Sequence, residues 1–394
     1  MRGTDVTDMK RTYRTPRVGE FPEELSLNLL KEFDLRYGEN PNQPGAAYRF
    51  QGTSLAEFTN IRLAKSGKGG LSATNLLDIT RALGILKFFQ KPAVAVMKHA
   101  SPSGFAEQHG GNNLEDIYRL ARDADARSAF GSVVVTTVPI DKNTAEAIVS
   151  TFVEAVAAPE YEQGVLDIFE RKKDIRAILF SNLDKLPKFA GDDTTGLYDL
   201  KVLPGGRVIV QTPYLSSIRG PKDLILDPLV RKNGQRYVVD RDPTEKELED
   251  LLTAWYVNTG ISSNAVVFVK DGLTVAIGSG QRDRVGAVEE AISKSYQKAL
   301  DRKRMLEEPE NFSWTRRNLS WKQMGAQLGY RPLEGAAMSS DGFLPFRDSI
   351  DAAAEEGVRA VIQPGGSRRD DEIIQAVNEY HMAMAYTLER CFGH

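Results

Sequence analysis

The sequence predicts an α/β protein, because short apolar segments typical of buried strands alternate with longer segments that have helical spacing. In the first half of the chain, strands are expected at 92–97 and 131–137, with a helix between them at 114–125. A second helix is expected over 144–158, where apolar residues recur on one helical face. Strands that alternate with helices in this way are typical of a sheet covered by helices.

The same alternation returns in the second half of the chain. A helix is expected over 245–256, followed by two strands, 265–269 and 273–277, that meet at the hairpin turn Asp271–Gly272. Beyond the hairpin, four further elements are expected to alternate between helix and strand: 285–300, 358–362, 370–379 and 382–386. The two halves therefore follow a similar order of elements, although no clear residue-level repeat relates them.

Differences in composition divide the chain into four segments. Residues 1–30 are polar and charged and are expected to form an extended arm, and the polar stretch 216–245 is the expected linker. Two α/β units, 31–215 and 246–394, account for the rest. A charged stretch at about 300–330 in the second unit is expected to be a helical insertion.

Composition and charge exclude several classes of function. The formal net charge of -3 gives no indication of nucleic-acid binding, so an anionic ligand has to be held by local arginines and lysines. The single cysteine, Cys391, cannot form an intrachain disulfide or supply the cysteine cluster of a structural zinc site, so no metal site is expected. The absence of a signal peptide and of a long apolar run predicts a cytoplasmic protein without a membrane span.

Lys98 and His99 are the first candidates for catalysis. They stand together immediately after an apolar strand, at the kind of strand end where ligands bind in α/β proteins. An imidazole can accept a proton and an ammonium can stabilise a developing oxyanion, so the pair has the composition of a base and an electrostatic stabiliser. A solvated loop without catalytic function is the alternative interpretation of the same residues.

Other polar segments that adjoin strand or helix ends can bind ligands. Arg36 and Tyr37 offer a fork for phosphate beside an aromatic face, although the segment also suits a surface turn. Gly131 allows a ligand to approach the backbone, and Glu154 can bind a ribose hydroxyl. The glycine-containing stretch 278–284 is typical of an anion-binding turn, but it lacks a dinucleotide fingerprint.

A last segment combines aromatic residues, Asp348 and a glycine turn. The sequence SSDGFLPFRD, followed by QPGGSR, suits a flat heteroaromatic ligand. Asp348 also suits the N-cap of a helix that carries Ile350 to Glu356, and for this segment in isolation the structural interpretation is the more common one.

Taken together and in this order, the segments resemble the transformylase domain of the bifunctional purine biosynthesis protein. The resemblance covers about residues 33–394, and several motifs in family order are far more specific than any one of them. The motifs are LRYGENPNQ, VMKHASPSGFA, SAFGSVV, FVEAVAAP, SSNAVVFVKDGLTVAIGSGQ, SSDGFLPFRDSIDAA and IQPGGS.

The resemblance implies a fold and an assembly. The two α/β units are expected to be related cytidine-deaminase-like subdomains, each with three αβα layers, in a homodimer whose active sites lie between the two chains. Few residues precede the first motif, so the inosine monophosphate cyclohydrolase domain of the family is not expected in this chain.

The resemblance also implies an activity, which is transfer of a formyl group from the co-substrate 10-formyltetrahydrofolate to the amine of AICAR. By resemblance His99 is the proton acceptor and Lys98 stabilises the oxyanion; a monovalent cation such as K+ is a compatible further ligand. The residues implied to bind the nucleotide are Arg36, Tyr37, Gly131, Glu154, Asn264, Arg284, Phe343 and Arg390. The residues implied to bind the folate are Val285, Asp348, Ser367 and Arg368.

The sequence departs from the family pattern at three places, one of which is the short helical insertion between Lys294 and Gly335. The family usually has a tyrosine and paired asparagines in the segment where Ala73 and Thr74 stand, and the C-terminal Arg-x-Phe-x-His motif contains Cys391 and Gly393. These departures concern folate affinity and dimer contacts more than the chemistry.

Two other functions remain open. One is a catalytically silent, AICAR-binding regulatory paralogue, and the intact Lys98–His99 pair argues against it. The other is a formyltransferase that acts on the same nucleotide with a different formyl donor, and the presence of Asp348 and Ser367 argues against that.

Overall fold

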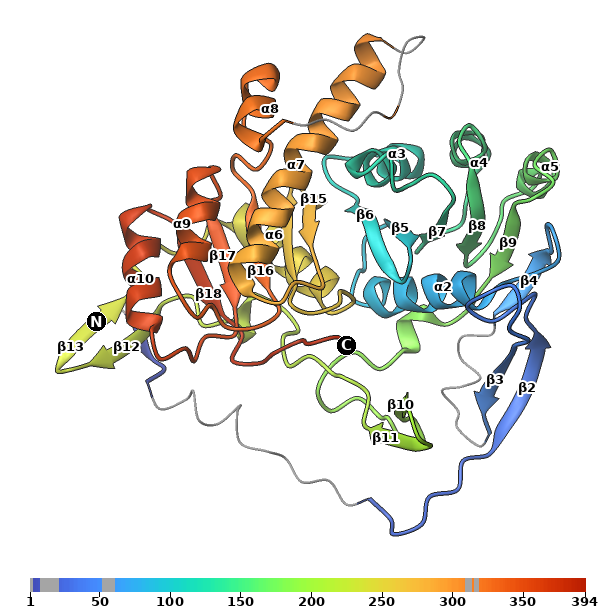
Figure 1. Cartoon of the computed structure of the whole chain (residues 1–394), viewed down its shortest axis with the longest axis horizontal. Helices are drawn as coiled ribbons and strands as arrows, with labels where there is room; N and C mark the ends of the chain where they lie inside the picture. The colour runs from blue at the N-terminus through green and yellow to red at the C-terminus, as the bar shows by residue number, and fades with distance from the viewer. Residues whose placement is uncertain (1–2, 8–20, 52–60, 309–313, 315–318) are drawn as a thin grey trace.

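Figure 1 shows the computed structural model, which describes residues 3–7, 21–51, 61–308, 314 and 319–394. Most of its strands join one long sheet of 11 strands, in the order β18-β17-β16-β14-β15-β6-β5-β7-β8-β9-β4. Helices lie against both faces of this sheet, so the predicted α/β class is confirmed.

The first half of the sheet is built around the hairpin β5–β6. Strand β5 pairs antiparallel with β6 and with β7, and β7, β8 and β9 are parallel to one another. Its elements, in chain order, are α2 (Ala73–Leu86), β5 (Ala93–Lys98), β6 (Ser101–Glu107), α3 (Leu114–Ala124), β7 (Ser132–Thr136), α4 (Lys142–Val149), β8 (Val153–Ala158), α5 (Val165–Glu170) and β9 (Arg176–Leu179).

The second half repeats this topology around the hairpin β14–β15. Strand β14 pairs antiparallel with β15 and with β16, and β16, β17 and β18 are parallel. Its elements are α6 (Glu245–Asn258), β14 (Val266–Lys270), β15 (Leu273–Gly278), α7 (Arg284–Glu307), α8 (Trp321–Leu328), β16 (Ala337–Ser340), α9 (Asp348–Glu355), β17 (Ala360–Gln363), α10 (Asp370–Glu379) and β18 (Ala383–Tyr386). Only α8 and the long end of α7 have no counterpart in the described part of the first half.

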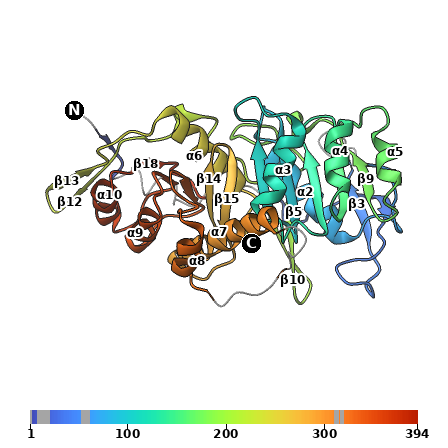
Figure 2. The ribbon, with the colours of Figure 1, turned by 90° about the horizontal axis from the view of Figure 1, so that it is seen from above.

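The two halves meet at the centre of the sheet, where β15 pairs antiparallel with β6 through Leu273 and Ala106. Figure 2 shows the halves side by side along the long axis, with the C-terminus between them. Because the two central strands are antiparallel, the beginning of β6 and the end of β15 lie at the same edge of the sheet.

Alternating side chains on each strand supply two apolar layers. In β5, Val94 and Val96 pack with the cluster that contains Ile117 of α3, whereas Ala95 and Met97 pack with the cluster around α2. A central strand that is buried on both faces is apolar throughout, which explains the continuous apolar run at 92–97.

The predicted helix over 144–158 is wrong. Helix α4 ends at Val149, and β8 begins at Val153 and runs between β7 and β9. Ile148 lies in α4, Phe152 lies between α4 and β8, and Val156 lies in β8, so their helical spacing spans two different elements. The doubly buried β8 is apolar at nearly every position and therefore does not interrupt the helical pattern. Glu154 therefore lies in a strand.

Apart from β4, the remaining described strands form small sheets outside the long one. Strand β4 (Arg62–Lys65) completes the long sheet, and β1 (Thr4–Asp5), β12 (Pro228–Lys232) and β13 (Gln235–Val238) form a separate sheet, so the segment 216–245 contains a hairpin. Two further hairpins, β2–β3 (Leu29–Asp34, Ala46–Phe50) and β10–β11 (Asp199–Leu203, Arg207–Gln211), extend from the body (Figure 1).

Part of the arm 1–30 and part of the insertion at 300–330 lie outside the described residues. None of the described helices combines the length and apolar composition needed to cross a bilayer.

Candidate active site

Lys98 ends β5, and His99 and Ala100 form the two-residue turn into β6. The half-buried Lys98 ammonium donates hydrogen bonds to the carbonyl oxygens of Phe130 at 3.2 Å and Gly131 at 2.6 Å. Gly131 has a φ of +70°, and a Cβ at this position would lie 3.1 Å from Lys98 Nζ. Glycine thus leaves room for the ammonium, which is held in place next to the exposed His99.

Glu154 lies near this turn and is held by two polar side chains. Asn75 Nδ2 donates to Glu154 Oε2 at 3.0 Å, and Arg176 Nη1 donates to the backbone oxygen of Glu154 at 3.4 Å. Burial lowers the pKa of the Arg176 guanidinium; the nearby charge of Glu154 raises it, and that of Arg36 lowers it. Cations and a carboxylate therefore lie together near the beginnings of β8 and β9. Lys98, His99, Glu154 and Arg176 are called the first cluster below.

Arg36 and Tyr37 reach the same region from the chain that precedes α2. The backbone N–H of Arg36 donates to Leu71 O at 2.8 Å, which fixes the segment against the loop before the helix. The Arg36 guanidinium lies 5.3 Å from the centre of the Tyr37 ring, within the range of a cation–π contact. The exposed guanidinium keeps its donors available to an anion.

Sequence reasoning did not select Asn75 or Arg176. A signal for Asn75 exists, because Asn75, Asp78 and Ile79 lie on the buried face of α2 at three- and four-residue spacing, and a buried polar side chain needs a partner. Arg176 has no such signal, since it donates to Gly70 O at 2.6 Å and only the fold brings those two residues together.

A second cluster surrounds Arg284 at the start of α7. The buried Arg284 guanidinium pairs through Nη1 with the fully buried carboxylate of Asp341, and Nη2 donates to Asn264 Oδ1 at 2.7 Å. Asn264 Nδ2 donates in turn to Gln281 O at 2.8 Å. Asp341 also accepts a hydrogen bond from Ser263 Oγ. Sequence reasoning included Asp341 in a motif but did not select it.

The C-terminal segment contributes Arg390 to this second cluster. The Arg390 guanidinium lies 5.4 Å from the ring centre of Phe343 and 5.3 Å from that of Phe392. The Arg284 guanidinium lies 6.0 Å from the centre of the same Phe392 ring, so two cations lie near one aromatic ring. The backbone N–H of Cys391 donates to Asp341 O at 3.2 Å, which ties the segment to the end of β16.

Both clusters lie at one edge of the long sheet. Lys98 and His99 precede the beginning of β6, and Asn264 and Arg284 flank the paired ends Val266 and Gly278 of β14 and β15. Since β6 and β15 are antiparallel neighbours, these ends share an edge. The sheet thus brings residues that are far apart in the sequence to the same edge.

The residues implied to bind folate follow the strand ends of the second half. Val285 is in the first turn of α7 beside Arg284, and Arg368 is exposed before α10. Ser367 is buried, and its Oγ accepts from the N–H of Arg369 at 3.1 Å. Asp348 is exposed and accepts from the N–H of Ser349 at 2.7 Å.

The alternative interpretation of Asp348 as a helix N-cap is off by one position. Helix α9 begins at Asp348 itself, and Arg347 occupies the cap position without a side-chain cap. A carboxylate at the first helical residue still interacts favourably with the helix dipole.

A cavity of about 440 Å³ adjoins the first cluster. Phe130 and Phe152, whose ring centres are 5.1 Å apart, form one wall, and Lys172 and Lys173 are also among its lining residues. The cavity therefore offers aromatic surface and positive charge next to the carbonyl groups that hold Lys98. Within the described ranges, no three His, Cys, Asp or Glu side chains gather in a way that could hold a metal ion.

The second half contains a counterpart of the Lys98 turn at the opposite edge of the sheet. Lys270 ends β14 as Lys98 ends β5, and its ammonium donates to the carbonyl oxygen of Glu334 at 2.7 Å. Gly335 donates its N–H to Gly357 O at 2.8 Å, as Gly131 donates to Phe152 O at 2.8 Å. The same backbone framework therefore surrounds a lysine in both halves.

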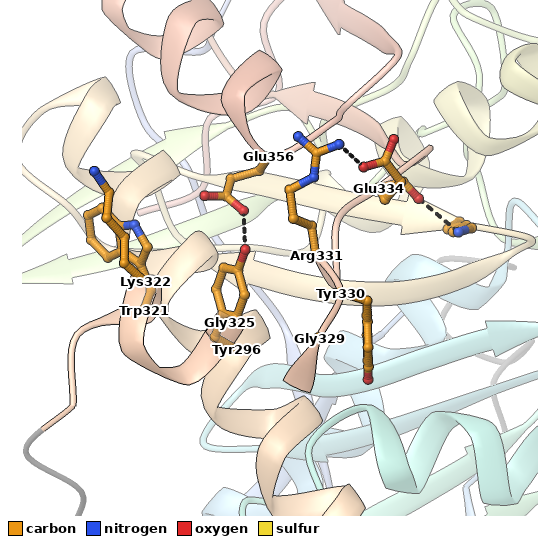
Figure 3. A pocket seen from close by; sticks show the side chains of 10 residues that line it. Tyr296, Trp321, Lys322, Gly325, Gly329, Tyr330, Arg331, Glu334 and Glu356 are labelled. Atoms are coloured by element: carbon orange, nitrogen blue, oxygen red, sulfur yellow. Dashed lines mark hydrogen bonds and ion pairs between the residues drawn. The ribbon is translucent and has the colours of Figure 1, made fainter. Parts of the chain in front are cut away.

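Figure 3 shows the cavity of about 700 Å³ beside this counterpart. Its polar side chains pair with one another: Tyr296 donates to the buried Glu356 at 2.5 Å, and Arg331 pairs with Glu334. Burial and the Glu356 carboxylate both raise the pKa of the Tyr296 hydroxyl, which stays protonated as a donor. These contacts stabilise the fold without requiring a ligand.

The fold and its clusters define an α/β protein with a duplicated sheet, a lysine–histidine turn and an arginine-rich cluster at one edge. The family model of the AICARFT/IMPCHase bienzyme matches residues 6–294, so the chain belongs to this family. The family is named for a bienzyme, and the match covers residues 6–294 of this chain.

Three relatives carry the name "Bifunctional purine biosynthesis protein PurH". The protein from Magnetococcus marinus is 37% identical over 382 residues, which cover 96% of this chain and 62% of that protein. The protein from Persephonella marina is 36% identical, and the match covers 95% of this chain and 62% of that protein. The protein from Caldicellulosiruptor saccharolyticus is 35% identical, and the match covers 95% of this chain and 61% of that protein. The chain therefore spans less than two thirds of the length of these relatives.

Proposed function

We propose that this chain transfers the formyl group of 10-formyltetrahydrofolate to the 5-amino group of AICAR. The observation that carries the proposal is the Lys98 ammonium, which two carbonyl oxygens hold next to His99 at an open edge of the sheet. The arginine-rich cluster of Arg284 and Arg390 lies at the same edge and suits a nucleotide. Membership of a family named for this transformylase supports the substrate assignment.

In the proposed complex, the nucleotide is bound by groups from both clusters. Guanidinium groups of Arg36 and Arg390 bind the phosphate, and Glu154 binds a ribose hydroxyl. Arg284 is already paired with Asp341, so its proposed role is to orient Asn264, which faces the carboxamide. The remaining contacts are the aromatic faces of Tyr37 and Phe343 and the close backbone approach at Gly131.

The proposed reaction needs one proton acceptor and one cation. The lone pair of the AICAR amine is delocalised into the ring system, so the amine is a weak nucleophile. As its nitrogen bonds to the formyl carbon, His99 accepts the amine proton and Lys98 stabilises the negative charge on the formyl oxygen. The bond between the formyl carbon and the folate N10 then breaks, and N10 takes up a proton. No covalent intermediate with the enzyme is required.

We propose that the folate lies against the residues that follow β15, β16 and β17. Asp348 is exposed and can accept the amino hydrogens of the pterin, and Val285, Ser367 and Arg368 are its neighbours at the same edge. In this proposed arrangement the donor lies beside the nucleotide, and the reaction needs no resident cofactor.

We also propose that the chain works as a homodimer with shared sites. The projecting β10–β11 hairpin exposes 79% of Val202 and 51% of Val208, which favours contact with another surface. Sedimentation of the purified chain is expected to show a dimer, whereas a fully active monomer at assay concentration would contradict this proposal.

An assay with purified components tests the activity. The chain is incubated with AICAR and 10-formyltetrahydrofolate, and the release of tetrahydrofolate and the formation of the formylated nucleotide are followed together. Equal amounts of both products support the proposal. Tight AICAR binding without product identifies a silent paralogue, and product formation only with another formyl donor identifies the alternative formyltransferase; either result contradicts the proposed reaction.

A further inference from the structure

The two-residue turn after Lys98, formed by His99 and Ala100, has residue types that are unusual for its backbone conformation. Both central residues have left-handed φ angles, 53° for His99 and 60° for Ala100. Two-residue hairpin turns of this kind favour Asn-Gly or Asp-Gly, because residues with a Cβ rarely adopt positive φ. The counterpart turn follows that preference, with Asp271 at 55° and Gly272 at 71°. The His99–Ala100 turn therefore depends more on contacts from outside the hairpin.

A buried aspartate of the preceding helix supplies such a contact in both halves. Asp78 of α2 accepts from the N–H of Ala100 at 2.5 Å. Asp250 of α6 accepts from the N–H groups of Asp271 at 3.1 Å and Gly272 at 2.9 Å. In both halves, the aspartate and the second turn residue are separated by 22 positions.

The position of each aspartate is fixed by the start of its helix. Asp78 lies six residues after the cap residue Ser72, and Asp250 lies six residues after the cap residue Thr244; both helices begin with a capping box. The two aspartates therefore occupy the same place in a duplicated framework.

The two aspartates differ in how many backbone N–H groups of the turn donate to them. Asp250 uses both carboxylate oxygens on the turn, whereas Asp78 contacts the turn through Oδ1 alone, which accepts from the N–H of Ala100. Asp78 is 6% exposed, and burial raises its pKa, an effect that the Ala100 N–H and the charges of His99 and Lys98 oppose. The turn with the less favourable residues thus has the smaller number of hydrogen bonds.

We propose that Asp78 is a positioning residue for the formyl transfer. Its hydrogen bond to Ala100 holds the left-handed turn and so fixes where the His99 imidazole lies relative to the Lys98 ammonium. The inference rests on the proposed function, because His99 and Lys98 are the reacting groups there. Asp78 itself touches neither substrate, and its effect on the reaction is exerted through the turn.

Three variants test this role kinetically. Asp78→Ala removes the hydrogen bond, and we expect kcat to fall about 10- to 100-fold with the KM for AICAR changed by less than about threefold. Asp78→Asn keeps an oxygen that accepts from Ala100, and we expect it to restore most of kcat. The matched control is Asp250→Ala, which is expected to lower the melting temperature while kcat per folded molecule stays within about twofold of wild type. A wild-type kcat in Asp78→Ala, or equal losses of kcat in both alanine variants, overturns the proposal.

A second measurement separates this inference from the proposed function. Hydrogen–deuterium exchange of the peptide around Ala100 is compared in the wild type, Asp78→Ala and Asp78→Asn. We expect faster exchange of this peptide in the alanine variant and near wild-type exchange in the asparagine variant. If the wild type transfers no formyl group but the exchange follows this pattern, the proposed function fails while the turn-holding contact stands. Unchanged exchange in Asp78→Ala overturns the proposal whatever the activity.

Discussion

The two halves of the long sheet share a framework but surround their central lysines with different side chains. In the first half, Lys98 is followed by His99, and Glu154 lies near the turn. In the second half, Lys270 is followed by Asp271, whose carboxylate pairs with Lys246 at 2.5 Å. The backbone contacts around the two lysines nevertheless correspond closely.

The difference extends to the neighbouring strands. If the matching hydrogen bonds of Gly131 and Gly335 are used to align the halves, Glu154 near the start of β8 corresponds to Arg359, the residue immediately before β17. The second half therefore has a cation where the first has a carboxylate, and an aspartate where the first has a histidine. If the proposed function holds, the duplicated fold keeps one copy of the turn for chemistry and the other for stability.

The largest expected effect comes from replacing Lys98 or His99 in the first half. We predict that Lys98→Ala and His99→Ala each reduce turnover by about a hundredfold or more, because they remove an oxyanion stabiliser and a proton acceptor. AICAR binding is expected to weaken less than turnover falls. The matched Lys270→Ala is expected to change turnover by less than about twofold and to lower stability by about 1 kcal/mol through loss of the bond to Glu334.

Steady-state kinetics and thermal unfolding of these variants check the prediction. Comparable losses of turnover in Lys98→Ala and Lys270→Ala would remove the functional difference between the halves. Near wild-type turnover in Lys98→Ala or His99→Ala would remove that residue from the mechanism.

The next effect concerns the arginine-rich cluster around Arg284 and Arg390. We predict that Arg390→Ala weakens AICAR binding by about 1.5–3 kcal/mol, since it removes a charged donor to the phosphate. The control is Arg219→Ala, because the exposed Arg219 guanidinium also lies over an aromatic ring, 5.2 Å from Phe189, but belongs to neither cluster. Titration calorimetry with AICAR distinguishes the two variants, and equal affinities would exclude Arg390 from the nucleotide site.

A similar or smaller effect is expected at the proposed folate position. Asp348→Ala is predicted to weaken donor binding by about 1–3 kcal/mol, because the amino hydrogens of the pterin lose their acceptor, while AICAR affinity stays nearly unchanged. Asp141→Ala is the control, since Asp141 caps α4 by accepting from the N–H of Thr144 at 2.7 Å and loses only stability. Affinity measurements for both ligands, together with melting temperatures, check the result. A lower melting temperature of Asp348→Ala with unchanged folate affinity would defeat the assignment.

The smallest effect tests the backbone of the two turns. Gly272→Ala is predicted to lower stability by about 1–2 kcal/mol, because alanine disfavours positive φ and a Cβ would lie 2.9 Å from Glu107 Cγ. Ala100→Gly is predicted to change stability by less than about 1 kcal/mol, since relief of strain and the greater freedom of the unfolded chain oppose each other. Chemical denaturation measures both, and a larger loss for Ala100→Gly than for Gly272→Ala would contradict the comparison of the turns.

Local patterns predicted much of the fold. The helix at 370–379 coincides with α10, and the hairpin at Asp271–Gly272 joins β14 and β15, because a turn and a helical face are encoded within a few residues. The helix at 144–158 failed because burial on both faces removes the alternation that identifies a strand. The joining of the two halves into one sheet was not predictable, since it depends on the distant pair Leu273 and Ala106.

The candidate site was predictable only where a motif carried it. Lys98 and His99 stand beside each other in the sequence, so their proximity needed no fold. Arg176 and Asp341 were not selected, because their partners Gly70 and Arg284 are far away in the chain. A buried polar residue on an apolar helical face, as at Asp78, is the signal that sequence reasoning can use in such cases.

The most direct test of formyl transfer at the Lys98 turn follows the formyl carbon itself. The wild type, Lys98→Ala and Lys270→Ala are each incubated with AICAR and 10-formyltetrahydrofolate labelled with ¹³C in the formyl group, and the nucleotide is examined by NMR. We predict label on the 5-amino nitrogen of the nucleotide with the wild type and Lys270→Ala, and a rate about a hundredfold or more lower with Lys98→Ala. Absence of label with the wild type, or equal labelling rates with all three proteins, would contradict the assignment of formyl transfer to the first half of the sheet.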